Sequence, residues 1–332
     1  MNRRYSRRAF VRELAFLPYV VPLLASYAHE IRPARVRRIG FMVGTGFSPL
    51  ETAFKDELRL MGYVEGAGLV IETRLSRPNT ADVPSQAMEL AHTDIELIVA
   101  GALPFALAVR TANPAMPMVI ATCPGMISNG FAQSIEHPGG NVTGIDELPD
   151  GVTTRRLTLL KAAAPALSRV ALLSTTPGRG GYETQLADAE RAATGLDIQV
   201  KAYRASSLDE LQKALAAIID DRMDGLLSFQ GGLALVNRQL IIDFAAAHRL
   251  PAIYQATLFA ESGGLMSWAP DLENQYRIAA RYVDKILRGA NPGDLPITFP
   301  PKYYLTIHAG TARRLGLTLP RTLLAEADRV LR

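Results

Sequence analysis

The 332-residue sequence predicts an α/β protein built from two doubly wound parallel-sheet lobes with a hinged cleft between them. Short apolar segments rich in β-branched residues alternate with amphipathic segments, which is the pattern of βαβ units. The series occurs twice, up to about residue 144 and again from about residue 168, with a Gly-, Pro- and Asn-rich stretch over 137–151 between the copies. The chain is also longer than one hydrophobic core usually accommodates, so two lobes are expected.

The apolar segments are expected to be strands, because parallel strands buried on both faces read as near-continuous hydrophobic runs. Apolar residues at spacings of three and four predict helices over 49–61 and 208–219, the second capped by Ser206 or Ser207 with Glu210 behind. A long helix over 271–288, a strand over 302–308 and two short helices follow. The expected strands span 38–44, 69–75, 96–102, 117–123, 169–175, 197–203, 224–230 and 251–255.

The two series define two lobes. We expect residues 36–144 and 267–292 to form an N-lobe, and residues 145–266 and 293–332 a C-lobe. Several chain crossings between such lobes would place a ligand cleft at the carboxyl ends of the strands. This architecture is suited to closing on a small molecule.

Residues 1–28 have the pattern of a signal peptide and resemble the twin-arginine export consensus around Arg7 and Arg8. Basic residues come first, then an apolar run over 14–25 that is too short and too rich in proline to span a bilayer, then Ser26-Tyr27-Ala28. No cysteine follows this run, so no lipid anchor is expected and the mature chain is expected to be periplasmic. A basic amphipathic N-terminus without an export role is the alternative.

Charge and composition argue against several classes of function. The formal net charge is +4, and residues 1–28 alone hold five arginines against Glu13, so the remaining chain is balanced and no nucleic-acid partner is expected. The five histidines and the single cysteine lack metal-ligand spacing, and no phosphate-binding loop or nucleophile elbow occurs. We therefore expect no metal, no cofactor and no enzyme activity. Cys123 could act as a nucleophile, although a small buried strand-end residue is the preferred interpretation.

Segments over 95–108, 137–145, 248–255 and 260–271, followed by 282–297 and 312–328, occur in an order that closely resembles the tryptophan/tyrosine-type substrate-binding proteins of bacterial ABC transporters. The resemblance covers residues 36–330. It implies a type I periplasmic-binding fold and a monomeric extracytoplasmic receptor that binds a small molecule, such as an amino acid or a related compound, and delivers it to an ABC permease in the membrane. Two alternatives are a ligand sensor that docks on a membrane receptor and an exported enzyme on the same fold.

Members of this family usually carry an Asp-Pro pair where this chain has Gly125-Met126. If that aspartate orients a cationic group, this chain needs a different counter-charge, and Asp146 is our candidate. The alternative is that Asp146 is an ordinary turn residue.

The other candidate ligand contacts lie just beyond predicted strand ends, where the cleft is expected. Amides that follow Ser48 could hold a carboxylate, or Ser48 could simply cap its helix. Trp268 could stack on a ligand or pack between the lobes. Gln255 directly follows the candidate Tyr254 at the end of the last strand. Together the candidates are Thr45, Gly46, Phe47, Ser48, Ala102, Leu103, Pro104, Thr122, Cys123, Asp146, Thr176, Tyr182, Gln230, Tyr254 and Trp268.

Overall fold

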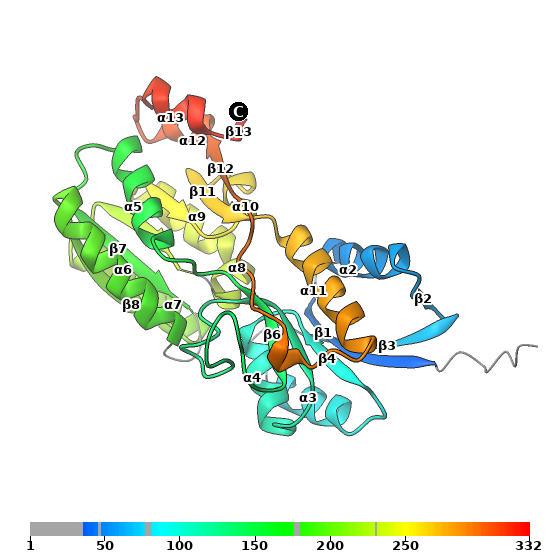
Figure 1. Ribbon diagram of the computed structural model, residues 1–332. Helices are drawn as coiled ribbons and strands as arrows, with labels where there is room; N and C mark the ends of the chain where they lie inside the picture. Colours follow the sequence, from blue (N-terminus) through cyan, green and yellow to red (C-terminus); the bar gives the residue numbers. More distant parts are fainter. Residues whose placement is uncertain (1–35, 46–47, 77–80, 176–179, 230) are drawn as a thin grey trace, which may run out of the picture. The chain divides into compact units, whose positions relative to one another are not determined.

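Two predominantly parallel sheets form the framework of the protein, as the computed structural model shows (Figure 1). It describes residues 36–45, 48–76, 81–175, 180–229 and 231–332. The first sheet has the strand order β2-β3-β1-β4-β5-β6 and the second the order β13-β12-β11-β10-β9-β7-β8. We call the parts built on these sheets the N-lobe and the C-lobe. Both orders contain the doubly wound arrangement in which the direction of winding reverses beside the first strand, β1 or β7.

The N-lobe sheet is covered by helices on both faces. Helices α2 and α11 bury apolar residues such as Phe54 and Val283 against one face, and α3 and α4 bury residues such as Leu90 and Phe105 against the other. All neighbouring strands of this sheet are parallel. The elements are β1 (Arg37–Gly44), α2 (Ser48–Leu60), β2 (Val64–Glu65), β3 (Gly68–Ser76), α3 (Val83–Ala91), β4 (Leu97–Ala100), α4 (Leu103–Ala112), β5 (Met118–Cys123), β6 (Val142–Asp146) and α11 (Leu272–Leu287).

The C-lobe repeats this plan and adds an edge that the N-lobe lacks. Helices α5 and α6 cover one face of the sheet, and α7, α9 and α10 cover the other. Strand β12 pairs antiparallel with β11 and parallel with β13, which extends the sheet beyond the βαβ units. The elements are α5 (Val152–Ala163), β7 (Arg169–Ser174), α6 (Gly180–Leu196), β8 (Gln199–Arg204), α7 (Leu208–Asp220), β9 (Gly225–Ser228), α8 (Gly232–Val236), α9 (Arg238–Ala247), β10 (Ala252–Tyr254), α10 (Thr257–Glu261), β11 (Met266–Pro270), β12 (Tyr303–His308), α12 (Ala309–Arg314), α13 (Arg321–Glu326) and β13 (Arg329–Leu331).

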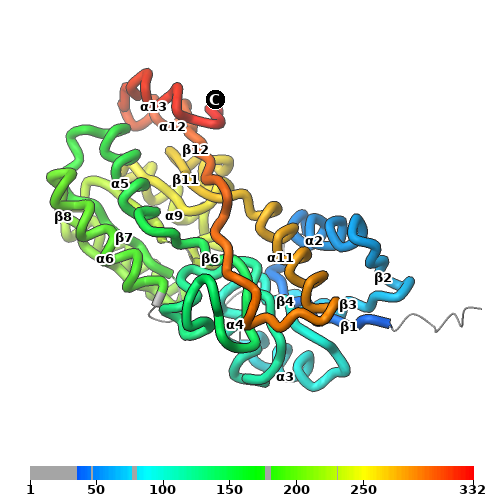
Figure 2. The backbone as a smooth tube through the Cα atoms, in the orientation of Figure 1, coloured from blue at the N-terminus to red at the C-terminus, as the bar shows by residue number. Residues whose placement is uncertain are grey.

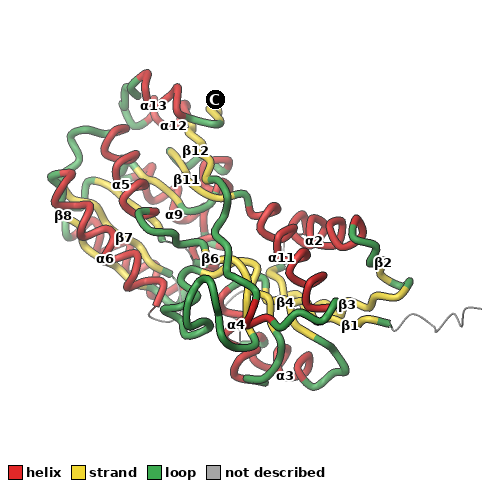
Figure 3. The backbone as a smooth tube through the Cα atoms, viewed as in Figure 1, coloured by secondary structure: helices red, strands yellow, loops and turns green. Residues whose placement is uncertain are grey.

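The chain passes between the lobes three times (Figure 2). The first crossing runs from β6 to α5, the second from β11 to α11, and the third from the 3-10 helix η2 (Pro292–Asp294) to β12. Loops form the first and third crossings, which Figure 3 shows in green. These two lie side by side, because the Asp146 amide donates to the Thr298 carbonyl at 2.9 Å and the Thr298 amide donates to the Gly144 carbonyl at 3.1 Å. The first and third crossings are therefore paired where they meet the N-lobe.

The predicted fold class is confirmed, and the eight predicted strands occur within a few residues of their expected bounds. Ser207 caps α7 by accepting from the Glu210 amide, while both the amide and the hydroxyl of Ser206 donate to the Glu210 carboxylate. One difference concerns the second crossing. Residues 266–270 pair with β10 and β12 in the C-lobe sheet, so this crossing follows Pro270, whereas we expected residues 267–292 to belong to the N-lobe.

The predicted signal peptide over 1–28 lies outside the described residues. Within the described part of the chain, no helix combines the length and the apolar character needed to cross a membrane.

Candidate functional site

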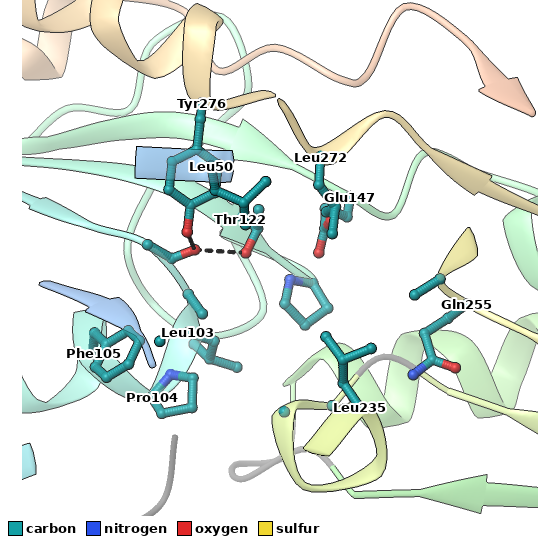
Figure 4. A pocket seen from close by; sticks show the side chains of 17 residues that line it. Leu50, Leu103, Pro104, Phe105, Thr122, Glu147, Leu235, Gln255, Leu272 and Tyr276 are labelled. Carbon is teal, nitrogen blue, oxygen red and sulfur yellow. Dashed lines mark hydrogen bonds between the residues drawn. The ribbon is translucent and has the colours of Figure 1, made fainter. Parts of the chain in front are cut away.

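A pocket lies between the two lobes, where the carboxyl ends of strands from both sheets meet (Figure 4). The space that it encloses is about 850 Å³ when the solvent-filled mouth is counted. The N-lobe supplies residues at or just after the ends of β1, β4, β5 and β6 together with α2, α4 and α11, and the C-lobe supplies α8 and the residues after β10. The lining consists of Gly44, Leu50, Gly101, Ala102, Leu103, Pro104, Phe105, Thr122, Pro124, Glu147, Gly231, Gly232, Leu235, Gln255, Ala256, Leu272 and Tyr276.

Most of the lining is apolar. Leu50 from α2, Leu103 and Phe105 from α4, and Leu272 from α11 form the wall on the N-lobe side, and Leu235 from α8 lies on the C-lobe side. Leu272 and Tyr276 are four residues apart, so both lie on the same face of α11. Such walls favour an apolar moiety of a ligand, because burying it removes hydrocarbon surface from water.

Two hydroxyl groups on the N-lobe side share one acceptor. The Thr122 hydroxyl donates to the Gly101 carbonyl at 2.8 Å, and the Tyr276 hydroxyl donates to the same carbonyl at 3.0 Å (Figure 4). Each hydroxyl has only one hydrogen to donate, so both oxygens keep lone pairs but no further hydrogen. These side chains therefore act toward the pocket as hydrogen-bond acceptors.

Glu147 is the one ionisable carboxylate among the lining residues. It begins the first crossing, and only 4% of its surface is exposed. Its Oε1 accepts from Gln275 Nε2 at 3.1 Å, its carbonyl accepts from the Tyr303 hydroxyl at 2.7 Å, and its amide donates to the Cys123 carbonyl at 2.8 Å. Burial, and after it the charge of Glu147, raises the pKa of the Tyr276 hydroxyl. A buried carboxyl group thus lies beside the pocket, where the chain leaves the N-lobe.

Gln255 contributes a polar group from the C-lobe. It follows β10, is 3% exposed, and lies across the pocket from Glu147 and Leu272 (Figure 4). Its Oε1 has no hydrogen-bond partner among the described residues. This oxygen can therefore accept a hydrogen bond from a group that enters the pocket.

We expected Asp146 to supply the counter-charge in the cleft, but it is engaged with the backbone and does not line the pocket. Its carboxylate is 4% exposed and accepts from the amides of Gly125 at 2.9 Å, Met126 at 2.7 Å and Leu148 at 2.9 Å. Burial raises the pKa of Asp146, and these three hydrogen bonds oppose the shift. Met126 can donate where a proline could not, because proline has no amide hydrogen. Asp146 therefore anchors the loop after β5, and the carboxylate that lines the pocket is its neighbour Glu147.

Of the predicted contacts, four line the pocket: Ala102, Leu103, Pro104 and Thr122. Several others lie elsewhere. Tyr254 is fully buried and stacks on Phe259 at 4.5 Å between ring centres, and Trp268 stacks on Tyr303 at the same distance. Tyr182 packs beneath the Arg204 guanidinium. Thr45, Ser48 and Cys123 are also absent from the lining, and Gly46, Phe47, Thr176 and Gln230 lie outside the described residues.

The thiol of Cys123 is fully buried, and burial raises its pKa well above the ordinary value. A thiol in this environment is a poor nucleophile, since the thiolate is the reactive form. Among the residues that the structure describes, no group of three or more His, Cys, Asp and Glu side chains could hold a metal ion.

Sequence reasoning missed Glu147 and Tyr276. Glu147 directly follows the chosen candidate, Asp146. The alternation of side-chain directions along a strand stops at the strand end, so it could not tell which of these two adjacent acids faces the cleft. Tyr276 belongs to the long helix after the second crossing. Its position four residues after Leu272 could have indicated a shared face, but not that this face borders the cleft.

Comparison with known proteins agrees with this description. The family model described as "ABC transporter substrate binding protein" matches residues 40–331. A protein named "Tyrosine-binding protein" from Clostridioides difficile (strain R20291) is 22% identical over 256 residues, which cover 77% of this chain and 73% of that protein. Two solved structures have the same fold. An ABC domain in complex with L-Trp from Streptococcus pneumonia has a TM-score of 0.82 at 21% identity, covering 89% of this chain and 99% of that one. A conserved domain protein from Vibrio cholerae has a TM-score of 0.80 at 23% identity, covering 89% and 100%. This chain belongs to the family of ABC transporter substrate-binding proteins.

Proposed function

We propose that this protein is a receptor that binds one small solute, an amino acid or a close relative of one, in the pocket between its lobes. The observation that carries the proposal is the pocket itself, which has apolar walls, the Glu147 carboxylate on one side and, on the other, Gln255, whose Oε1 has no partner among the described residues. The names of the relatives, which refer to tyrosine and L-Trp, support an aromatic amino acid as the first ligand to try.

We further propose that the bound solute is delivered to an ABC permease and that the mature chain works as a monomer outside the cytoplasmic membrane. Membership of the family supports the permease, and the basic and apolar pattern of residues 1–28 supports export. The mechanism needs no covalent chemistry. The lobes close about the paired first and third crossings, and the solute is released when they open.

Mass spectrometry of the solute released on denaturation tests the receptor function. Protein purified under native conditions should release one small molecule in near-stoichiometric amount. Leu235→Trp should abolish its retention, because the larger side chain fills the pocket, whereas Val236→Trp on the same helix should retain it, because Val236 is exposed and lies outside the lining. Equal release from both variants would place the solute elsewhere.

A further inference from the structure

The polar side chains on the N-lobe side of the pocket have one property in common, which is that they present hydrogen-bond acceptors to it. The Glu147 carboxylate can only accept hydrogen bonds when it is ionised. The hydroxyls of Thr122 and Tyr276 have both committed their hydrogen to the Gly101 carbonyl, and no described residue donates to either hydroxyl oxygen. Three side chains on this side therefore offer acceptors and no hydrogen.

We propose that Glu147, Thr122 and Tyr276 form a seat for the ammonium group of an apolar primary amine, and that this positive charge, rather than a ligand carboxylate, decides which solutes bind. An ammonium group brings three donors and a charge, which match an acceptor surface that contains one carboxylate. The proposal rests on the proposed function, since it concerns the same pocket.

The arrangement of charge supports this selectivity. The described lining contains one acidic side chain and no lysine, arginine or histidine. The buried Arg156 of α5 is the cation for which an interaction with Glu147 is seen: burial lowers its pKa to about 10, and the charges of Tyr303 and Glu147 oppose that shift. Its Nε donates to the Trp268 carbonyl at 3.1 Å and its side chain does not line the pocket. A ligand ammonium would pair with Glu147, whereas a ligand carboxylate would meet a like charge with no cationic side chain among the described lining residues to offset it.

The rest of the pocket selects an apolar body for this amine. Leu50, Leu103, Leu235 and Leu272 offer hydrocarbon surface, and Phe105 adds an aromatic ring. The expected ligand class is therefore an aliphatic or aromatic primary amine, and the corresponding amino acid belongs to this class because it carries the same group.

Calorimetric titration of two matched trios tests the seat. One trio is L-tyrosine, tyramine and 3-(4-hydroxyphenyl)propionate, and the other is L-leucine, isoamylamine and 4-methylpentanoate. We expect that, in at least one trio, the amine binds within about tenfold of the amino acid and the acid without an amine binds at least roughly a hundredfold more weakly, as loss of a charged hydrogen-bond partner predicts.

Glu147→Gln assigns the effect to one residue. This variant keeps an oxygen for the Gln275 amide but loses the charge, so it should weaken amine binding by about ten- to a hundredfold and remove the preference for the amine over the acid. Glu136→Gln, which changes an exposed acid outside the pocket, should bind like the wild type. If thermal unfolding shows that Glu147→Gln does not fold, Thr122→Val removes one acceptor of the seat and should weaken amine binding by about fivefold.

The outcomes separate this proposal from the receptor function. Tight binding of an acid while its amine fails to bind would overturn the seat and leave the receptor standing. A retained natural solute without an amine would do the same. Absence of binding in both trios, together with absence of any retained solute, would overturn the seat and count against the receptor as well.

Discussion

The two lobes touch backbone to backbone at Gly181, near the beginning of α6, and this contact allows a sharp test of lobe closure. A Cβ atom on Gly181 would lie 2.3 Å from the carbonyl oxygen of Pro124, in the loop after β5. A Cβ on Gly125 would in turn lie 3.3 Å from the Gly181 Cα. We therefore predict that Gly181→Ala hinders closure of the N-lobe on the C-lobe.

The size of the effect follows from the geometry. An ordinary contact between a carbon and a carbonyl oxygen is about 3.3–3.6 Å, so the new methyl group must move the lobes apart by roughly 1 Å at this point. The obstacle is backbone, which cannot rotate away as a flexible side chain can. Overpacking of this kind costs about 1–3 kcal/mol, so solute affinity should fall by roughly five- to a hundredfold.

The assay is calorimetric titration with the tightest-binding solute, alongside thermal unfolding without solute. Gly195→Ala is the matched control, because it lies in the same helix and a Cβ there meets nothing within 4 Å. Gly181 and Gly195 lie near opposite ends of α6 and neither has a positive φ, so the helix backbone accepts alanine at both positions. Neither should therefore unfold more easily than the wild type. Equal affinities for Gly181→Ala and Gly195→Ala would refute the contact as part of the closed, solute-bound state.

Three further predictions concern the end of β5 and the loop that follows it. Asp146→Asn should lower the free energy of unfolding by about 1–3 kcal/mol in denaturant titration, because the new NH₂ group would face either the amide N–H of Met126 or those of both Gly125 and Leu148. Burial raises the native pKa of Asp146 above its ordinary value of 3.8, so the native state holds the proton to higher pH than the unfolded state does. The contribution of Asp146 to the free energy of unfolding therefore declines as pH rises from the unfolded pKa to the native pKa. The asparagine variant should lack this pH dependence, and an unchanged dependence would contradict the assignment. Cys123, fully buried with a raised pKa, should react with an aromatic disulfide reagent only after unfolding, and rapid reaction of the native protein would show that the loop opens.

The periodicity of the sequence predicted the lobes because each βαβ unit has its signal within a few tens of residues. The strand over 266–270 was harder to place, since its membership of the C-lobe depends on pairing with Tyr303–His308, more than 30 residues later along the chain. Short strands such as Val64–Glu65 and Arg329–Leu331 carry too few residues for a periodic signal.

The candidate site was only partly predictable for a similar reason. Positions at or just beyond the carboxyl ends of strands, such as Thr122 and Ala102, follow from the rule that ligands bind at the carboxyl edge of a doubly wound sheet. The choice between Asp146 and Glu147 depends on which carboxylate the amides of Gly125 and Met126 capture, and that contact joins residues about 20 positions apart. Tyr276 reaches Gly101 across 175 positions, which no local pattern encodes.

Hydrogen exchange with and without a saturating amount of the tightest-binding solute tests the central claim most directly, because it reports on both lobes in one experiment. We predict that the solute slows exchange at residues 101–106 in the N-lobe, at residues 255–256 in the C-lobe and along the first crossing over 147–151. All three segments should respond over the same range of solute concentration. Slower exchange confined to one lobe, with the facing residues and the crossing unchanged, would contradict a solute held between two closing lobes.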